Sequence, residues 1–144
     1  MRHIYRWSII LAILLLSGCA KQLTQQRSIS IDQPIYLRGV FTWWDAESQY
    51  QLHPVAGHSG LWMTQIELIA DGQPYEWKIG DKDWQCGTDF GYLSDDSPMV
   101  LGQSRAVDSC AQFNSLKFTP KQDGFYQFYL DVSHQPAIVY INKK

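Results

Sequence analysis

The sequence has little charge and no marked excess of either sign. Its 144 residues include 12 Lys and Arg against 14 Asp and Glu, and charged residues make up 18% of the chain. A nucleic-acid-binding domain normally carries a basic stripe, which this balance does not supply, so we expect no nucleic-acid partner. The aromatic content of 14% excludes a disordered chain, because there is ample apolar surface to bury.

Motifs for catalysis and metal binding are also missing. There is no Cys-x-x-Cys pair, and His53, His58 and His134 lack ligand spacing, so we expect neither metal nor cofactor. Gly57-His58-Ser59-Gly60 fails the spacing of a serine nucleophile elbow. Glycoside hydrolysis needs two carboxyls about 5–10 Å apart across a cleft, and the sequence singles out no such pair. The chain is therefore not expected to be an enzyme.

The body of the chain contains no apolar run long enough to span a membrane. The N-terminus begins with Arg2, His3 and Arg6 and continues with a short apolar stretch, residues 7–16, which is typical of a signal peptide. Residues 16–19, Leu-Ser-Gly-Cys, resemble the lipobox of bacterial lipoprotein precursors. The resemblance implies cleavage before Cys19 and lipidation of that cysteine. The alternative is an ordinary cleaved signal with a chance cysteine.

The resulting organisation has three parts. Residues 1–18 are the lipoprotein signal peptide, residues 19–33 are the lipidated cysteine and a flexible polar tether, and residues 34–144 are one domain. Several acyl chains give stable anchoring, so the membrane is an expected partner. Ala20 stands where some lipoproteins carry an inner-membrane retention Asp, which favours the outer membrane of a Gram-negative cell envelope.

Two cysteines remain in the domain. Cys86 and Cys110 are expected to form a disulfide, since an exported protein meets an oxidising environment. The loop that this bond closes has about 25 residues, and the chain-entropy model assigns it roughly 3 kcal/mol.

Turn residues punctuate the domain at short intervals, and no apolar helical repeat appears. This pattern predicts an all-β fold, an immunoglobulin-like β-sandwich of about seven strands. The expected strands are residues 35–41, 50–53, 61–69, 74–80, 113–119, 125–132 and 137–142. A long insertion, residues 81–112, separates the fourth strand from the fifth and carries both domain cysteines.

Alternation along the strands sorts their two faces. In the fourth strand the apolar set belongs to the core, so Lys78 is expected to point to solvent or to a ligand. The side chains assigned to the core are Tyr75, Trp77, Ile79, Tyr126, Phe128 and Leu130.

Four segments together resemble glycogen- and starch-binding modules. Residues 36–44, Tyr-Leu-Arg-Gly-Val-Phe-Thr-Trp-Trp, resemble the opening strand of these modules, and residues 75–84 resemble their Tyr-x-Phe-Lys segment with its following Trp. Residues 88–118 contain Thr-Asp-Phe-Gly and Asn-Ser-Leu-Lys-Phe, similar to a run in accessory domains of pullulanases. Residues 124–131, Gly-Phe-Tyr-Gln-Phe-Tyr-Leu-Asp, match the closing strand. The chain also resembles the related isoamylase N-terminal-like domains, which are immunoglobulin-like.

The resemblance implies an immunoglobulin-like domain that binds α-1,4-linked glucans such as glycogen, starch and maltodextrin. It assigns glucan binding to Trp44, Lys78, Trp84 and Asn114. Two departures are visible: Thr42 replaces the usual Asn, and Ser115 interrupts the Asn-Leu-Lys run.

Elementary chemistry agrees with these assignments, because an indole offers an apolar platform to the C–H face of a sugar ring. The two indoles are expected to be bare and roughly coplanar. Each residue also has a structural interpretation. Trp84 is either a platform or an anchor for the loop, and Trp43 is an alternative to Trp44 as the exposed ring. Lys78 is otherwise a solvated lysine, and Asn114 a turn former.

Two functions therefore stand at this point. The first is a non-catalytic, membrane-anchored lipoprotein that binds α-glucans and serves an envelope amylase or pullulanase. The second is an envelope protein–protein interaction module that docks a partner enzyme or secretion component, since an immunoglobulin-like fold does not by itself fix the function.

Overall fold

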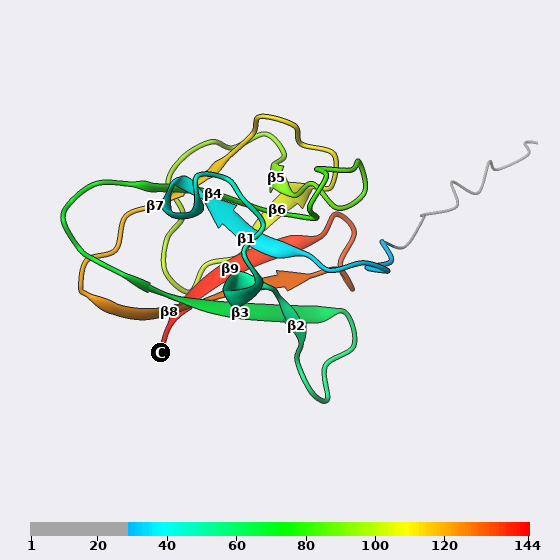
Figure 1. Cartoon of the computed structure of the whole chain (residues 1–144), viewed down its shortest axis with the longest axis horizontal. Coiled ribbons are helices and arrows are strands. Elements are labelled where there is room, and N and C mark those ends of the chain that lie inside the picture. Colours follow the sequence, from blue (N-terminus) through cyan, green and yellow to red (C-terminus); the bar gives the residue numbers. More distant parts are fainter. Residues whose placement is uncertain (1–28) are drawn as a thin grey trace, which may run out of the picture.

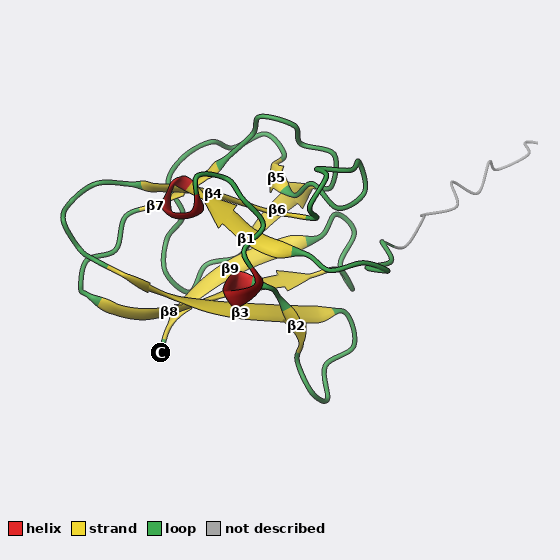
Figure 2. Cartoon of the chain, viewed as in Figure 1, coloured by secondary structure: helices red, strands yellow, loops and turns green. Residues whose placement is uncertain are grey.

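Two β-sheets supply most of the regular structure of the computed structural model, which describes residues 29–144. The expectations for residues 1–18 and for Cys19 lie outside the described residues. In Figure 1, β3 and β8 run along the lower side of the domain, and β1, β4 and β7 lie above them. The helical pieces of the described chain are two short 3₁₀ turns, η2 (Val40–Thr42) and η3 (Ser48–Tyr50) (Figure 2).

The sheets differ in size, and their hydrogen-bonded strand pairs are antiparallel. The small sheet has the order β1-β4-β7, and the large sheet has the order β2-β3-β8-β9-β6-β5. The strands are β1 (Tyr36–Gly39), β2 (His53–Pro54), β3 (Leu61–Leu68), β4 (Tyr75–Gly80), β5 (Gly91–Tyr92), β6 (Arg105–Asp108), β7 (Leu116–Phe118), β8 (Gly124–Asp131) and β9 (Ile138–Lys143).

The core lies between the two sheets. Trp77 of β4 is fully buried and meets Phe128 of β8 edge to face, with ring centroids 4.9 Å apart. Ile79, Tyr126 and Leu130 are buried with them, as strand alternation predicts. The all-β sandwich is therefore confirmed. Burying each such side chain contributes about 1.5–3 kcal/mol before conformational entropy is subtracted.

The strand boundaries differ from the prediction by one residue at several ends and by more elsewhere. The expected first strand, residues 35–41, ends at Gly39, because residues 40–42 form the turn η2. The expected second strand, residues 50–53, is interrupted: Tyr50 ends the turn η3, Gln51 forms an isolated bridge with Tyr36, and only His53–Pro54 pairs as β2. The expected fifth strand, residues 113–119, begins at Leu116, because the preceding residues form a turn. The insertion contributes two short strands, β5 and β6, which extend the large sheet.

The predicted disulfide between Cys86 and Cys110 is present. It joins the two arms of the insertion, which also pair through backbone bonds from Gly87 and Asp89 to the carbonyl oxygen of Ser109. Phe90 bridges to Ile79 of β4, so the braced insertion is attached to the small sheet.

The last residues of the expected tether pack on the domain. Ile29 and Ile31 contact the hydrophobic core, and the side chain of Gln33 donates to Asp81 Oδ2 at 2.5 Å. Residues 29–33 thus pack against the domain of residues 34–144. Within the described part of the chain, no helix is long and apolar enough to cross a membrane.

Candidate functional site

The first tryptophan of the site follows a tight turn at the end of β1. Gly39 is required there, because a Cβ at this position would lie 2.3 Å from the carbonyl oxygen of Glu76. The Thr42 hydroxyl accepts from the amide of Gly39 and donates to its carbonyl, both at 3.1 Å. Trp43 and Trp44 then adopt left-handed backbone conformations, with φ of 52° and 67°. Thr42, a departure from the family pattern, thus closes the turn.

This turn sends the two adjacent indoles to different environments. Trp43 is 88% exposed and is not among the side chains that line the neighbouring cavity. Trp44 is half-buried and lines that cavity. Trp44 is therefore the ring that lies at the candidate site.

Trp84 lies in the turn that follows β4. The carboxylate of Asp81 accepts from the amides of Asp83 at 2.7 Å and of Gln85 at 3.2 Å, the usual way in which Asp organises a turn. The indole lies against Gly80, where a Cβ would be 2.7 Å from two of its ring carbons. Only glycine leaves room for the ring on this face of β4.

Arg38 contacts both tryptophans. Its guanidinium carbon lies 3.6 Å from the centroid of the Trp84 ring, a cation–π contact worth about 0.5–2 kcal/mol. Its Nε donates to the carbonyl oxygen of Trp44 at 2.7 Å, and its Nη1 donates to the carbonyl oxygen of Asp81. Burial lowers the pKa of Arg38, while Asp45 and Asp81 oppose that shift.

The two indoles form an angled pair. Their ring centroids are 6.4 Å apart and their planes are inclined by 52°. The expectation of coplanar rings is therefore wrong. The Trp84 ring stacks against the guanidinium group of Arg38. The direction of the Trp44 side chain is set instead by the backbone turn after β1.

Lys78 is buried at 3% exposure rather than solvent-facing. Its Nζ forms an ion pair with Asp89 and donates to the carbonyl oxygen of Gln112. Alternation correctly places Lys78 on the outer face of β4, but the insertion covers that face. The Nζ atom still lies 5.1 Å from the Trp84 ring centroid.

A cavity of about 760 Å³ brings these groups together. This volume falls within the range of about 300–1,000 Å³ that is typical of small-molecule sites. The lining residues are Trp44, Glu76, Lys78, Trp84, Asp89, Gln112, Phe113 and Ser115. Three of the four predicted glucan-binding residues are therefore neighbours in space.

Asn114 is not among the lining residues. Its side-chain amide donates to the carbonyl oxygen of Tyr92 at 3.2 Å, and its own carbonyl accepts from the amide of Tyr92 at 2.9 Å. Its contacts join the loop before β7 to the insertion.

Sequence reasoning missed Arg38, Asp89 and Phe113 as parts of this site. Arg38 lies directly across from Lys78 in the β1–β4 register. Correct pairing of these two strands would therefore have indicated that Arg38 belongs to the site. Asp89 and Phe113 depend on how the insertion folds back, which no local pattern indicates.

The acidic turn residue Asp81 has a shifted pKa. Burial by itself raises the pKa of Asp81, but hydrogen bonds from the Thr88 hydroxyl and from the amides of Gln85, Asp83 and Trp84 outweigh it, so the pKa is lowered. Asp81 is thus held as the carboxylate that fixes the Trp84 turn.

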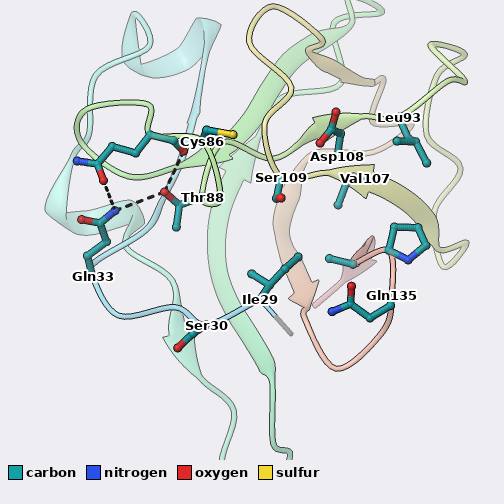
Figure 3. A pocket seen from close by; sticks show the side chains of 14 residues that line it. Ile29, Ser30, Gln33, Cys86, Thr88, Leu93, Val107, Asp108, Ser109 and Gln135 are labelled. Carbon is teal, nitrogen blue, oxygen red and sulfur yellow. Dashed lines mark hydrogen bonds between the residues drawn. The ribbon is translucent and has the colours of Figure 1, made fainter. Parts of the chain in front are cut away.

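A second cavity, of about 680 Å³, lies where the N-terminal segment meets the insertion (Figure 3). Its walls include Gln33, Thr88 and Gln135. Gln33 donates to Thr88 Oγ1 and to Gln85 Oε1, each at 3.4 Å, as the dashed lines show. The side chains of Gln33, Gln85 and Thr88 thus bond to each other. None of the four predicted glucan-binding residues lines this cavity.

Within the described residues, no group of three or more His, Cys, Asp or Glu side chains is placed to hold a metal ion.

The comparisons give a fold relationship. No protein-family model matches the chain, and no curated protein matches it. Among solved structures, it is similar to the ligand-induced structure of the starch-binding domain AmyP-SBD, with a TM-score of 0.57 and 15% identity. The match covers 79% of this chain and 74% of that chain. At this identity the similarity establishes a shared β fold.

Proposed function

We propose that this protein is a non-catalytic α-glucan-binding module. The observation that carries the proposal is the cavity lined by Trp44 and Trp84, whose planes are inclined by 52°. Each indole offers an apolar surface to the C–H face of one glucose residue, and the polar groups between them orient its hydroxyls.

The angle between the rings favours an α-linked chain. An α-1,4-glucan curves, so successive sugar rings turn relative to one another and can meet two inclined platforms. A β-1,4-glucan is flat and suits coplanar platforms. Glycogen, starch and maltodextrin are therefore the proposed ligands, and cellulose fragments are not.

The charges around the cavity suit a neutral ligand. Lys78 and Asp89 neutralise each other, and Glu76 Oε2 accepts from the Ser115 hydroxyl at 3.2 Å. A lysine ammonium has three N–H donors. Two of these are used by Asp89 and Gln112, and we assign the third to a sugar hydroxyl. Asn114 is assigned to holding the loop, through its contacts with Tyr92.

The same contacts support the proposal of binding without hydrolysis. Hydrolysis requires two carboxyls that flank the substrate bond. Of the two carboxylates that line the cavity, Asp89 is buried and paired with Lys78. A shallow site of this kind should bind with a Kd on the order of µM to mM. The fold shared with AmyP-SBD, a starch-binding domain, supports the proposal.

The N-terminal sequence extends the proposal to a place in the cell. Lipidation at Cys19 would anchor the module to the outer membrane of a Gram-negative envelope, where it holds glucan near an amylase or pullulanase. Metabolic labelling with palmitate tests the anchor, because only a lipidated cysteine takes up the acyl chain. The wild-type protein should become labelled and a Cys19→Ser variant should not; an unlabelled wild-type protein would contradict the anchor.

Electrophoresis through a glycogen-containing native gel tests glucan binding. The full-length protein, in a detergent without a sugar headgroup, should be retarded, and Trp84→Ala should abolish the retardation. Trp43→Ala is the matched control, because Trp43 is exposed but does not line the cavity. Unretarded migration of the wild-type protein would refute the proposal.

A protein-interaction module is the second candidate. The exposure of Trp43 and Phe113 favours it, since large aromatic side chains often anchor interfaces. Under this alternative a stoichiometric partner enzyme or secretion component should co-purify, and maltodextrin should not displace it.

A further inference from the structure

Phe113 is the most exposed large apolar side chain in the described chain, at 93%. It also lines the cavity that contains Trp44 and Trp84. An apolar side chain that is exposed and borders a concave site has a surface that a ligand can cover. Neither the family resemblance nor the comparison with AmyP-SBD assigns this residue a role.

The backbone around Phe113 is fixed rather than loose. The amide of Asn114 donates to the carbonyl of Ala111, and the amide of Ser115 donates to that of Phe113, both at 2.9 Å. The amide of Ala111 donates to the carbonyl of Asp89, also at 2.9 Å. The preceding cysteine, Cys110, is held by the disulfide.

Lys78 adds an attachment from the sheet. Its ammonium group donates to the carbonyl oxygen of Gln112, the residue before Phe113, and pairs with Asp89. Gln112 itself has a left-handed backbone, with φ of 42°. The buried lysine thus joins β4, the insertion and the Phe113 loop, and this fixes the backbone that carries Phe113 at the edge of the cavity.

We propose that Phe113 is a third aromatic contact for the glucan, one that binds a glucose residue beyond those covered by the two indoles. This inference rests on the proposed function. It makes chain length a determinant of affinity, because a disaccharide that fills the positions at Trp44 and Trp84 has no further glucose residue for Phe113. Preorganisation of the loop backbone lowers the entropic cost of that contact.

Titration calorimetry with maltose and maltoheptaose tests the inference on the full-length protein in a detergent without a sugar headgroup. The wild-type protein should bind maltoheptaose more tightly than maltose, which has one glucose residue for each indole and none for Phe113. Phe113→Ala should raise the Kd for maltoheptaose about tenfold, equivalent to about 1.4 kcal/mol, and leave the Kd for maltose unchanged. Phe113→Tyr should restore the wild-type preference.

Phe125→Ala is the matched control, because Phe125 is an exposed phenylalanine on β8 of the other sheet. It should change neither Kd. Equal Kd values for Phe113→Ala and wild type, or equal losses for both sugars, would overturn the inference while leaving the proposed function intact. Wild-type protein that binds neither sugar would refute the proposed function itself, and the exposed ring would then point to a protein partner.

Discussion

Arg38 lies between the two tryptophans without lining the cavity. It stacks on the ring of Trp84 and donates to the backbone carbonyl of Trp44, so it ties the turn that carries Trp44 to the ring of Trp84. Hydrogen bonds to charged groups contribute about 1.5–3 kcal/mol each, and burying the freed carbonyl oxygens adds to the loss.

Arg38→Met should therefore lower the free energy of unfolding by about 2–4 kcal/mol and weaken glucan binding. Urea unfolding and calorimetry measure the two effects. Arg105→Met is the control, since Arg105 bonds to an exposed loop at Ser97 and should cost much less. An Arg38→Met protein with wild-type stability and affinity would show that the stacking is incidental.

The buried pair of Lys78 and Asp89 predicts strong coupling between two substitutions. Removing one partner leaves the other charge buried and unpaired, which costs about 3–5 kcal/mol. Lys78→Met and Asp89→Asn should each destabilise strongly. The double variant should lose clearly less free energy of unfolding than the two single variants lose in sum. Urea unfolding of the four proteins measures the coupling, and strictly additive losses would contradict the pairing.

At the scale of elements, the turn of residues 81–85 should make the free energy of unfolding depend on pH in the acidic range. The folded-state pKa of Asp81 is lowered by its hydrogen bonds, whereas an unfolded Asp titrates near about 3.9. The contribution of the Asp81 carboxylate to stability is thus present above about pH 4 and is lost as the pH falls through the folded-state pKa.

Asp81→Asn should therefore be destabilised by about 1–3 kcal/mol at pH 7, and the gap to wild type should shrink below pH 4. Urea unfolding at pH 7 and pH 3 measures this change. Asp71→Asn is the control, because Asp71 accepts the amide of Gln73 in an exposed turn. A gap that stays constant across this range would exclude Asp81 as the titrating group.

Strand alternation predicts the inner faces well and the outer face of β4 poorly. It places Trp77, Ile79 and Phe128 in the core, as observed. It leaves Lys78 in solvent, because the period of a strand carries no information about a distant segment that covers it. The insertion supplies that cover with Asp89 and Gln112. The strands β5 and β6 were missed because each is short and lies among polar turns.

At the scale of the whole molecule, the site is assembled from parts far apart in the sequence. The turn after β1 supplies Trp44, β4 and its turn supply Lys78 and Trp84, and the loop before β7 supplies Phe113. The resemblance to glucan-binding modules selects three of these four, because their motifs are local. Phe113 and the supporting Arg38 follow only from the folded arrangement.

The most direct test of the account compares maltoheptaose with cellohexaose in the same calorimetric titration of the full-length protein. The inclined indoles predict saturable binding of maltoheptaose, with a Kd on the order of µM to mM, and no saturable heat with cellohexaose. Equal binding of both sugars, or no binding of maltoheptaose, would contradict the account.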